Sequence, residues 1–200
     1  MKKVMVGAVL AVLSLSLPAF ANTTNKFQVK GQTADANFYQ SDECNYTSVG
    51  IFASDNVSKS SSGTPTSQKG AYIHYSNYNF CTGQGSYADG FAPDVTFTSD
   101  NSLRSATLNG TVTVNDYSSG STKTVNLALT WTGTGDTFRG NSHSHQQGPR
   151  FTSNYRYVGA YRQAQVSGSV TLDGKNLISG LSSYASLNST NSGSVEIVRQ

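Results

Sequence analysis

Hydrophobic and polar residues alternate through the middle of this chain, and this two-residue period constrains the fold more than any other feature. Between residues 105 and 116, the positions at 108, 110, 112 and 114 are leucine, glycine and valine, and threonine or asparagine stands between them. A turn-rich segment follows at 117–121, and the alternation resumes up to Trp131. Side chains of a β-strand point alternately to its two faces. The two stretches therefore predict a hairpin whose strands each have one buried and one solvated face.

The composition of the rest of the chain favours the same class of structure. After residue 21 the chain is poor in the helix-forming residues Glu, Lys, Leu and Met and rich in Thr, Val, Tyr and Phe, which suit strands. Further strands are expected near residues 26–32, 46–53, 71–80, 94–98, 154–172 and 194–198, with a loop over 58–67. We therefore expect residues 22–200 to form one all-β domain, an antiparallel β-sandwich of the jelly-roll kind. A closed up-and-down β-barrel is the alternative.

One pattern occurs twice. The segment 106–114 has Ala, Leu, Gly, Val and Val at alternate positions, and the segment 164–172 has Ala, Val, Gly, Val and Leu at the matching ones. A glycine inside a strand indicates a bulge or a close backbone approach. The two segments are therefore expected to occupy equivalent places in the fold, unless alternating Val/Thr/Gly strands resemble each other by chance.

The first 21 residues have the organisation of a secretory signal peptide. Lys2 and Lys3 precede an apolar run over 4–17, and Ala19-Phe20-Ala21 provides a cleavage signal. The mature protein should begin near Asn22 and be periplasmic or secreted, and its short, threonine-rich strands disfavour a membrane-embedded barrel. Loss of Lys2 and Lys3 leaves 12 basic and 11 acidic residues. Since phosphate-cradling loops and nucleotide motifs are also absent from the sequence, we expect no nucleic-acid partner.

Two cysteines remain after export, Cys44 and Cys81. An oxidising compartment makes a disulfide between them the default expectation. Their spacing fits neither a C-x-x-C redox pair nor a thiolate metal site. The bridge should bring their Cα atoms within about 7 Å.

The segment 137–172 is basic and aromatic and contains no Asp or Glu. Tyr155 and Tyr157 should share one face of a strand, with Arg156 on the other. Such a surface suits stacking on sugars or contact with acidic polymers, although pairing with the acidic segment 31–58 inside the molecule would explain the same asymmetry. The candidate binding residues are Arg139, Arg150, Tyr155, Arg156, Tyr157, Tyr161 and Arg162.

His143 and His145 form a His-x-His pair, which on an extended backbone would place both imidazoles on one face, about 6–7 Å apart. That spacing allows both to chelate one divalent metal ion, but a zinc centre needs at least one more ligand. The alternative is two solvated histidines in a polar loop. Without this metal, no cofactor is expected.

No reaction can be assigned from these residues, since neither a Gly-x-Ser-x-Gly nucleophile turn nor a readable carboxylate pair is present. The leading hypothesis is therefore an exported, non-catalytic binding or adhesion domain that presents its aromatic and arginine-rich surface to a glycan or another extracellular partner. One alternative is a metal-binding protein, conceivably a metalloenzyme, centred on His143 and His145. The other is a self-associating surface or matrix protein that pairs exposed strand edges.

Overall fold

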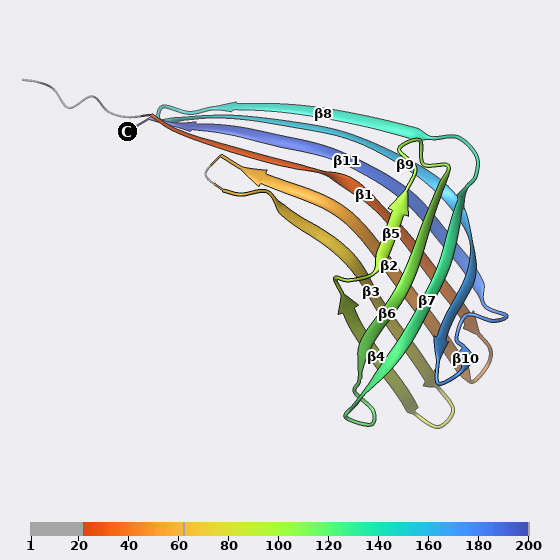
Figure 1. Ribbon diagram of the computed structural model, residues 1–200. Coiled ribbons are helices and arrows are strands. Elements are labelled where there is room, and N and C mark those ends of the chain that lie inside the picture. Colours follow the sequence, from red (N-terminus) through yellow and green to blue (C-terminus); the bar gives the residue numbers. More distant parts are fainter. Residues whose placement is uncertain (1–21, 62, 200) are drawn as a thin grey trace, which may run out of the picture.

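The computed structural model describes residues 22–61 and 63–199, and the predicted signal peptide lies outside them. The described residues form eleven strands in one antiparallel sheet (Figure 1). The strands are β1 (Thr23–Ser41), β2 (Asn45–Ser60), β3 (Thr66–Asn79), β4 (Gln84–Ala92), β5 (Thr96–Ser99), β6 (Ser105–Asp116), β7 (Ser121–Gly133), β8 (Phe138–Gln147), β9 (Phe151–Leu172), β10 (Lys175–Asn176) and β11 (Ser182–Val198). The all-β antiparallel fold is confirmed, as is the predicted hairpin, which is β6–β7.

The strand pairings return on themselves. They run from β9 through β11, β1, β2, β3, β4 and β6 to β7, which pairs with β9 again. The sheet is therefore ring-like, and this connectivity is nearer to the closed alternative than to two stacked sheets. The expected loop over 58–67 is shorter than predicted, because β2 extends to Ser60 and β3 begins at Thr66. Strands β4 and β8, the short β10 and most of β11 were not foreseen.

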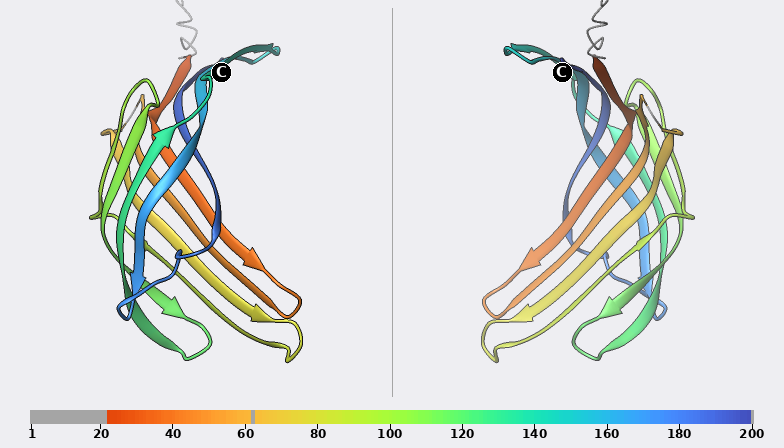
Figure 2. Two further views of the ribbon diagram at one scale, coloured as in Figure 1. Left: turned by 90° about the vertical axis from the view of Figure 1, so that its right-hand side faces the viewer. Right: turned by 90° about the vertical axis from the view of Figure 1, so that its left-hand side faces the viewer.

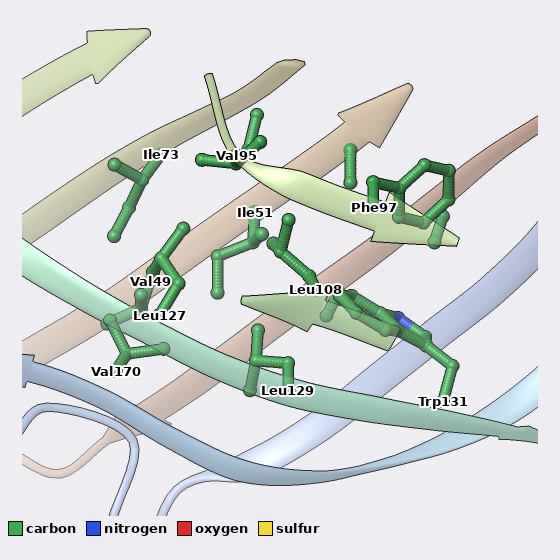
Figure 3. Packing of buried hydrophobic residues seen from close by; sticks show 14 of the residues in the cluster. Val49, Ile51, Ile73, Val95, Phe97, Leu108, Leu127, Leu129, Trp131 and Val170 are labelled. Atoms are coloured by element: carbon green, nitrogen blue, oxygen red, sulfur yellow. The ribbon is translucent and has the colours of Figure 1, made fainter. Parts of the chain in front are cut away.

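Apolar side chains fill the interior of the ring (Figure 3). Trp131, Phe97 and Leu108 are each at most 1% exposed, and they pack with residues from strands on both sides of the ring. The Trp131 Nε1–H donates to the backbone oxygen of Asp35 at 2.9 Å, so the one polar atom of this side chain is satisfied. The interior of the ring is therefore a packed apolar core, and the candidate binding surfaces lie on the exterior.

The repeated pattern corresponds to the two strands that flank β7. Leu129 of β7 faces Leu108 of β6 on one side and Gly168 of β9 on the other. Gly168 has a φ of 122°, and a Cβ there would lie 2.0 Å from the Ala128 carbonyl oxygen. This glycine is required by the close backbone approach expected from the sequence.

A curved arm of the sheet extends beyond the ring (Figure 1). We define the arm as β8 together with residues 151–160 of β9, 188–198 of β11, 23–33 of β1, 54–60 of β2 and 66–70 of β3. Figure 2 shows the end of the arm that carries β8 projecting from the top of the body. Few residues of the arm are buried, so both of its faces are available to partners.

At the end of the body opposite the arm, an ion pair closes the β6–β7 hairpin. Lys123 Nζ lies 2.7 Å from Asp116 Oδ2, and Asp116 Oδ1 accepts hydrogen bonds from the backbone N–H groups of Ser118 and Ser119. The Lys123 ammonium, with the donors of the turn, lowers the pKa of the Asp116 carboxyl to about 2. Asp116 therefore favours the folded state while it is ionised.

We expect the change Asp116→Asn to make stability less sensitive to acid. A carboxyl with a depressed folded pKa contributes stability above its unfolded pKa of about 4, and this contribution is lost as the pH falls from about 4 to about 2. Urea midpoints at pH 7 and pH 2 should differ less in Asp116→Asn than in the wild type. The change at exposed Asp94→Asn is the control and should leave the wild-type difference in place. An unchanged pH difference in Asp116→Asn would contradict this role.

Candidate binding surfaces on the arm

The register of the strands assigns every residue of the arm to one of two faces. Directly opposed residues of antiparallel strands point to the same side of a sheet. Ala34 of β1, opposed to Leu187 of β11 and Ala53 of β2, points into the core of the ring. Counting outward in steps of two from these residues gives the face of the arm that continues the ring interior, which we call the inner face. The opposite side is the outer face.

The inner face of the arm is basic. Its Lys and Arg side chains, by register, are Lys26, Lys30, Lys59, Lys69, Arg139 and Arg156. These are six of the 12 basic residues that follow the predicted signal, whereas Asp55 is the single acid among the described residues of this face. Asp55 lies 3.7 Å from Lys69 and so offsets only one of the six charges. The inner face therefore has a large excess of positive charge on a nearly neutral protein.

Two hollows lie along this face. One, of about 700 Å³, is lined by Lys26, Lys59 and Arg156 among other residues. The second, of about 570 Å³, is lined by Lys30 and Arg139 and is bounded by the loop between β5 and β6. Gln32 Nε2 donates to Asn101 Oδ1 of this loop at 3.1 Å, which joins the base of the arm to the body.

The four predicted arginines do not lie together in the structure. Arg139 and Arg156 lie on the inner face, whereas Arg150 lies in the turn between β8 and β9. Arg162 also points inward but at the base of the arm, opposite Leu187, where its Nε is buried without a hydrogen-bond partner. Only Arg139 and Arg156 therefore belong to the basic cluster.

The predicted tyrosines lie on the other side of the sheet. Tyr155, Tyr157 and Tyr161 are on the outer face, so the expected separation of Tyr155 and Tyr157 from Arg156 is found. A hollow of about 470 Å³ is lined there by Tyr157, Tyr161 and Phe138 among others, and its floor includes Gly159. The aromatic and the arginine-rich parts of the predicted site are thus back to back and cannot contact one ligand face together.

Tyr161 is tied to a neighbouring strand. Its hydroxyl and that of Tyr184 are 2.5 Å apart, and this hydrogen bond, with partial burial, raises the pKa of Tyr161 to about 12. Its ring also lies 6.4 Å from that of Phe138. The Tyr161 phenol is therefore neutral at physiological pH and held in place.

His143 and His145 both lie on the inner face, on β8, which is a strand and not the polar loop of the alternative. His145 Nδ1 lies 2.6 Å from Asn154 Oδ1 of β9. An amide oxygen can only accept, so the Nδ1–H is the donor, and Nε2 takes no part in this hydrogen bond. Within the described part of the chain, no three His, Cys, Asp or Glu side chains are grouped as metal ligands would be.

A second polar cluster lies on the outside of the body, around Asp89 of β4. Its carboxylate accepts hydrogen bonds from the hydroxyls of Tyr72 at 3.0 Å, Tyr117 at 3.1 Å and Tyr87 at 3.3 Å. The hydrogen bond to Asp89 is the main cause that raises the pKa of Tyr117, and the pKa of Tyr72 is raised mainly by its hydrogen bond with Tyr87. With its oxygens engaged by three phenols, Asp89 joins β3, β4 and the β6–β7 turn, which is a structural role.

Sequence reasoning missed the four lysines of the inner face. Lys26, Lys30 and Lys59 alternate in step with their strands, so each strand taken alone places them on one side. What the sequence does not contain is the pairing of β1 with β11 and of β11 with β9, which brings these lysines onto the same face as Arg139 and Arg156.

Comparison with known proteins gives little. No family model matches the chain, and no curated protein matches it in sequence. An AttH-like protein from Nitrosomonas europaea is 12% identical, with a TM-score of 0.28 over 88% of this chain and 52% of its own, so this chain spans about half of its length. An acetoacetate decarboxylase-like enzyme from Sphingomonas wittichii is 10% identical, with a TM-score of 0.23 over 88% and 91%. Likeness at this level carries no argument about fold or function. The described residues contain no helix that is long and apolar enough to cross a membrane.

Proposed function

We propose that the protein is an exported, non-catalytic binding domain that holds an acidic polysaccharide on the inner face of its arm. The observation that carries the proposal is the segregation of charge, with six basic side chains and one acid on this face. Mutual repulsion of these cations is relieved when an anionic ligand binds, and a concave surface of one sign raises the local concentration of such a ligand.

The spacing of the charges favours a polymer over a small anion. The basic rows extend over six residues along the strands and over six neighbouring strands, or roughly 20 Å by 24 Å. Arg156 and Lys59 are separated by two intervening strands, hence by roughly 14 Å. The six basic side chains are spread too widely to converge together on one phosphate or carboxylate, but they can contact successive groups of an extended chain.

The uncharged side chains of this face favour a glycan among polymers. Between the basic residues lie amides and hydroxyls that can bond to sugar hydroxyls, namely Gln28, Gln32, Ser189, Asn191 and Asn154. By register, no Phe, Tyr or Trp of the described arm falls on the inner face. Single-stranded nucleic acids are usually held by stacking of their bases on aromatic rings, so this surface suits them poorly.

We expect the triple change Lys30→Gln, Lys59→Gln and Arg156→Gln to weaken binding of heparin and of alginate, with an effect between about threefold and a hundredfold. Each exposed charge contact contributes about 0.2–1 kcal/mol, so the three together contribute about 0.6–3 kcal/mol, and each 1.4 kcal/mol is a factor of ten in affinity. Wild-type binding should weaken steeply between 50 mM and 300 mM salt because screening shortens the range of these contacts. Isothermal titration calorimetry with each polymer measures both effects.

Two control variants test whether the loss of affinity is specific to the inner face and whether a change of net charge alone explains it. Lys123→Gln with Lys175→Gln removes two cations of the body outside the arm, and Tyr155→Ala with Tyr157→Ala alters the outer face. Both should retain wild-type affinity. Equal loss in the charge control, binding of neutral dextran, or tighter binding of single-stranded DNA than of either polysaccharide would overturn the proposal.

A further inference from the structure

Strand β8 is an open edge of the sheet. It pairs with β9 on one side, and the structure shows no described strand on the other. All ten of its residues are exposed, it contains no Lys, Pro, Asp or Glu, and Arg139 is its one arginine. Proteins usually block such edges with Lys, Pro or a bulge, because unpaired backbone groups recruit another strand.

The hairpin turn fixes which residues of β8 direct their backbone to this edge. Gly148 N–H donates to the Phe151 carbonyl oxygen at 2.8 Å, one step beyond the pairing of Gln147 with Thr152. Hydrogen-bonded positions alternate along an antiparallel pair. The even-numbered residues of β8 therefore bond to β9, and the odd-numbered residues present their N–H and C=O groups to the open edge.

The two histidines are odd-numbered, and two imidazoles are half of the ligand set of a tetrahedral zinc site. Their imidazoles share the inner face, about 6–7 Å apart along the strand. The His145 Nδ1–H donates to Asn154 Oδ1, which orients the ring through the nitrogen other than Nε2, the arrangement usual for metal-bound histidines. The described residues provide no third ligand within the same chain.

We propose that a second copy of this chain pairs with β8 and that one zinc ion bridges the two strands through four histidines. Only odd-numbered residues can form hydrogen bonds across the open edge, so in an antiparallel β8–β8 pair odd-numbered residues oppose odd-numbered ones and the two inner faces lie on the same side. When Ser144 lies on the two-fold axis, His143 faces His145 of the partner subunit, and His145 faces the partner's His143. Opposed Cα atoms are then about 5.5 Å apart, so four imidazoles surround one point at the scale of a tetrahedral zinc site.

Arg156 should lower the affinity of this site for zinc. It is the cross-strand partner of His143, so two guanidinium groups flank the four imidazoles of the dimer. Their positive charge opposes the metal ion. Removing them should therefore strengthen the zinc-dependent dimer while it weakens polysaccharide binding, which makes the two proposals separable.

Sedimentation velocity of the untagged protein tests the inference. We expect monomers in EDTA, dimers when zinc reaches one ion per two chains, and monomers again after chelation. His143→Gln should stay monomeric with zinc, Arg156→Gln should dimerise at several-fold lower zinc, and His74→Gln, on the outer face of the body, should behave as the wild type. A dimer in EDTA, a zinc-dependent dimer of His143→Gln, or a monomer that binds zinc one to one would each overturn the proposal.

Discussion

Replacing Trp131 with alanine is expected to lower the free energy of unfolding by about 3–5 kcal/mol. The side chain is 0% exposed, so its loss leaves a cavity in the core, and the Asp35 carbonyl oxygen loses its hydrogen bond with the indole Nε1–H. Domains of this size are commonly stable by about 5–15 kcal/mol, so this one change removes a large part of the total. Because Trp131 is the only tryptophan, urea unfolding should be followed by circular dichroism instead of fluorescence.

The control is an aromatic side chain on the outside of the body. Phe52 is 45% exposed, and Phe52→Ala should change the free energy of unfolding by less than about 1 kcal/mol. Equal effects of the two substitutions would contradict the placement of Trp131 in the core.

Loss of the disulfide should have an effect of similar size by a different route. Cys44 and Cys81 are bridged, with Cα atoms 5.2 Å apart, as the sequence predicted. Their separation is 37 positions, and closing a loop of this length stabilises the folded state by about 3–4 kcal/mol on the chain-entropy model. Neither residue is buried, so Cys44→Ser with Cys81→Ser should lower the urea midpoint without creating a cavity.

The double serine variant should keep the far-ultraviolet spectrum of the wild type, because the core around β6 and β7 does not depend on the bridge. Addition of a reductant should lower the midpoint of the wild type to that of the variant and leave the variant unchanged. Quantitative thiol labelling of the native wild-type protein would instead show that no bridge forms.

Local signals in the sequence were enough for the strand class and the bridge, because alternation and cysteine count act within short segments or through one covalent bond. These signals failed where a strand pairs with a segment that is distant in the sequence. The expected strand at 194–198 is the end of β11 (Ser182–Val198), whose central residues are small and polar and lack the alternation that marked β6 and β7. Because β11 connects β1 to β9, missing it meant missing the basic inner face. Of the seven arginines and tyrosines predicted as binding residues, only Arg139 and Arg156 lie on that face.

Adjacent residues along each strand of the arm point to opposite faces of the sheet. A substitution on one face leaves the other chemically intact, so the charge of the inner face and the aromatic outer surface can change independently through point mutations. An inserted or deleted residue in β9 has the opposite effect, because a shift of one residue moves each side chain beyond it to the other side of the sheet. Arg156 would then lie among the outer tyrosines, and Tyr157 among the lysines. Variation in this arm should therefore accumulate as substitutions, with changes of length confined to its turns.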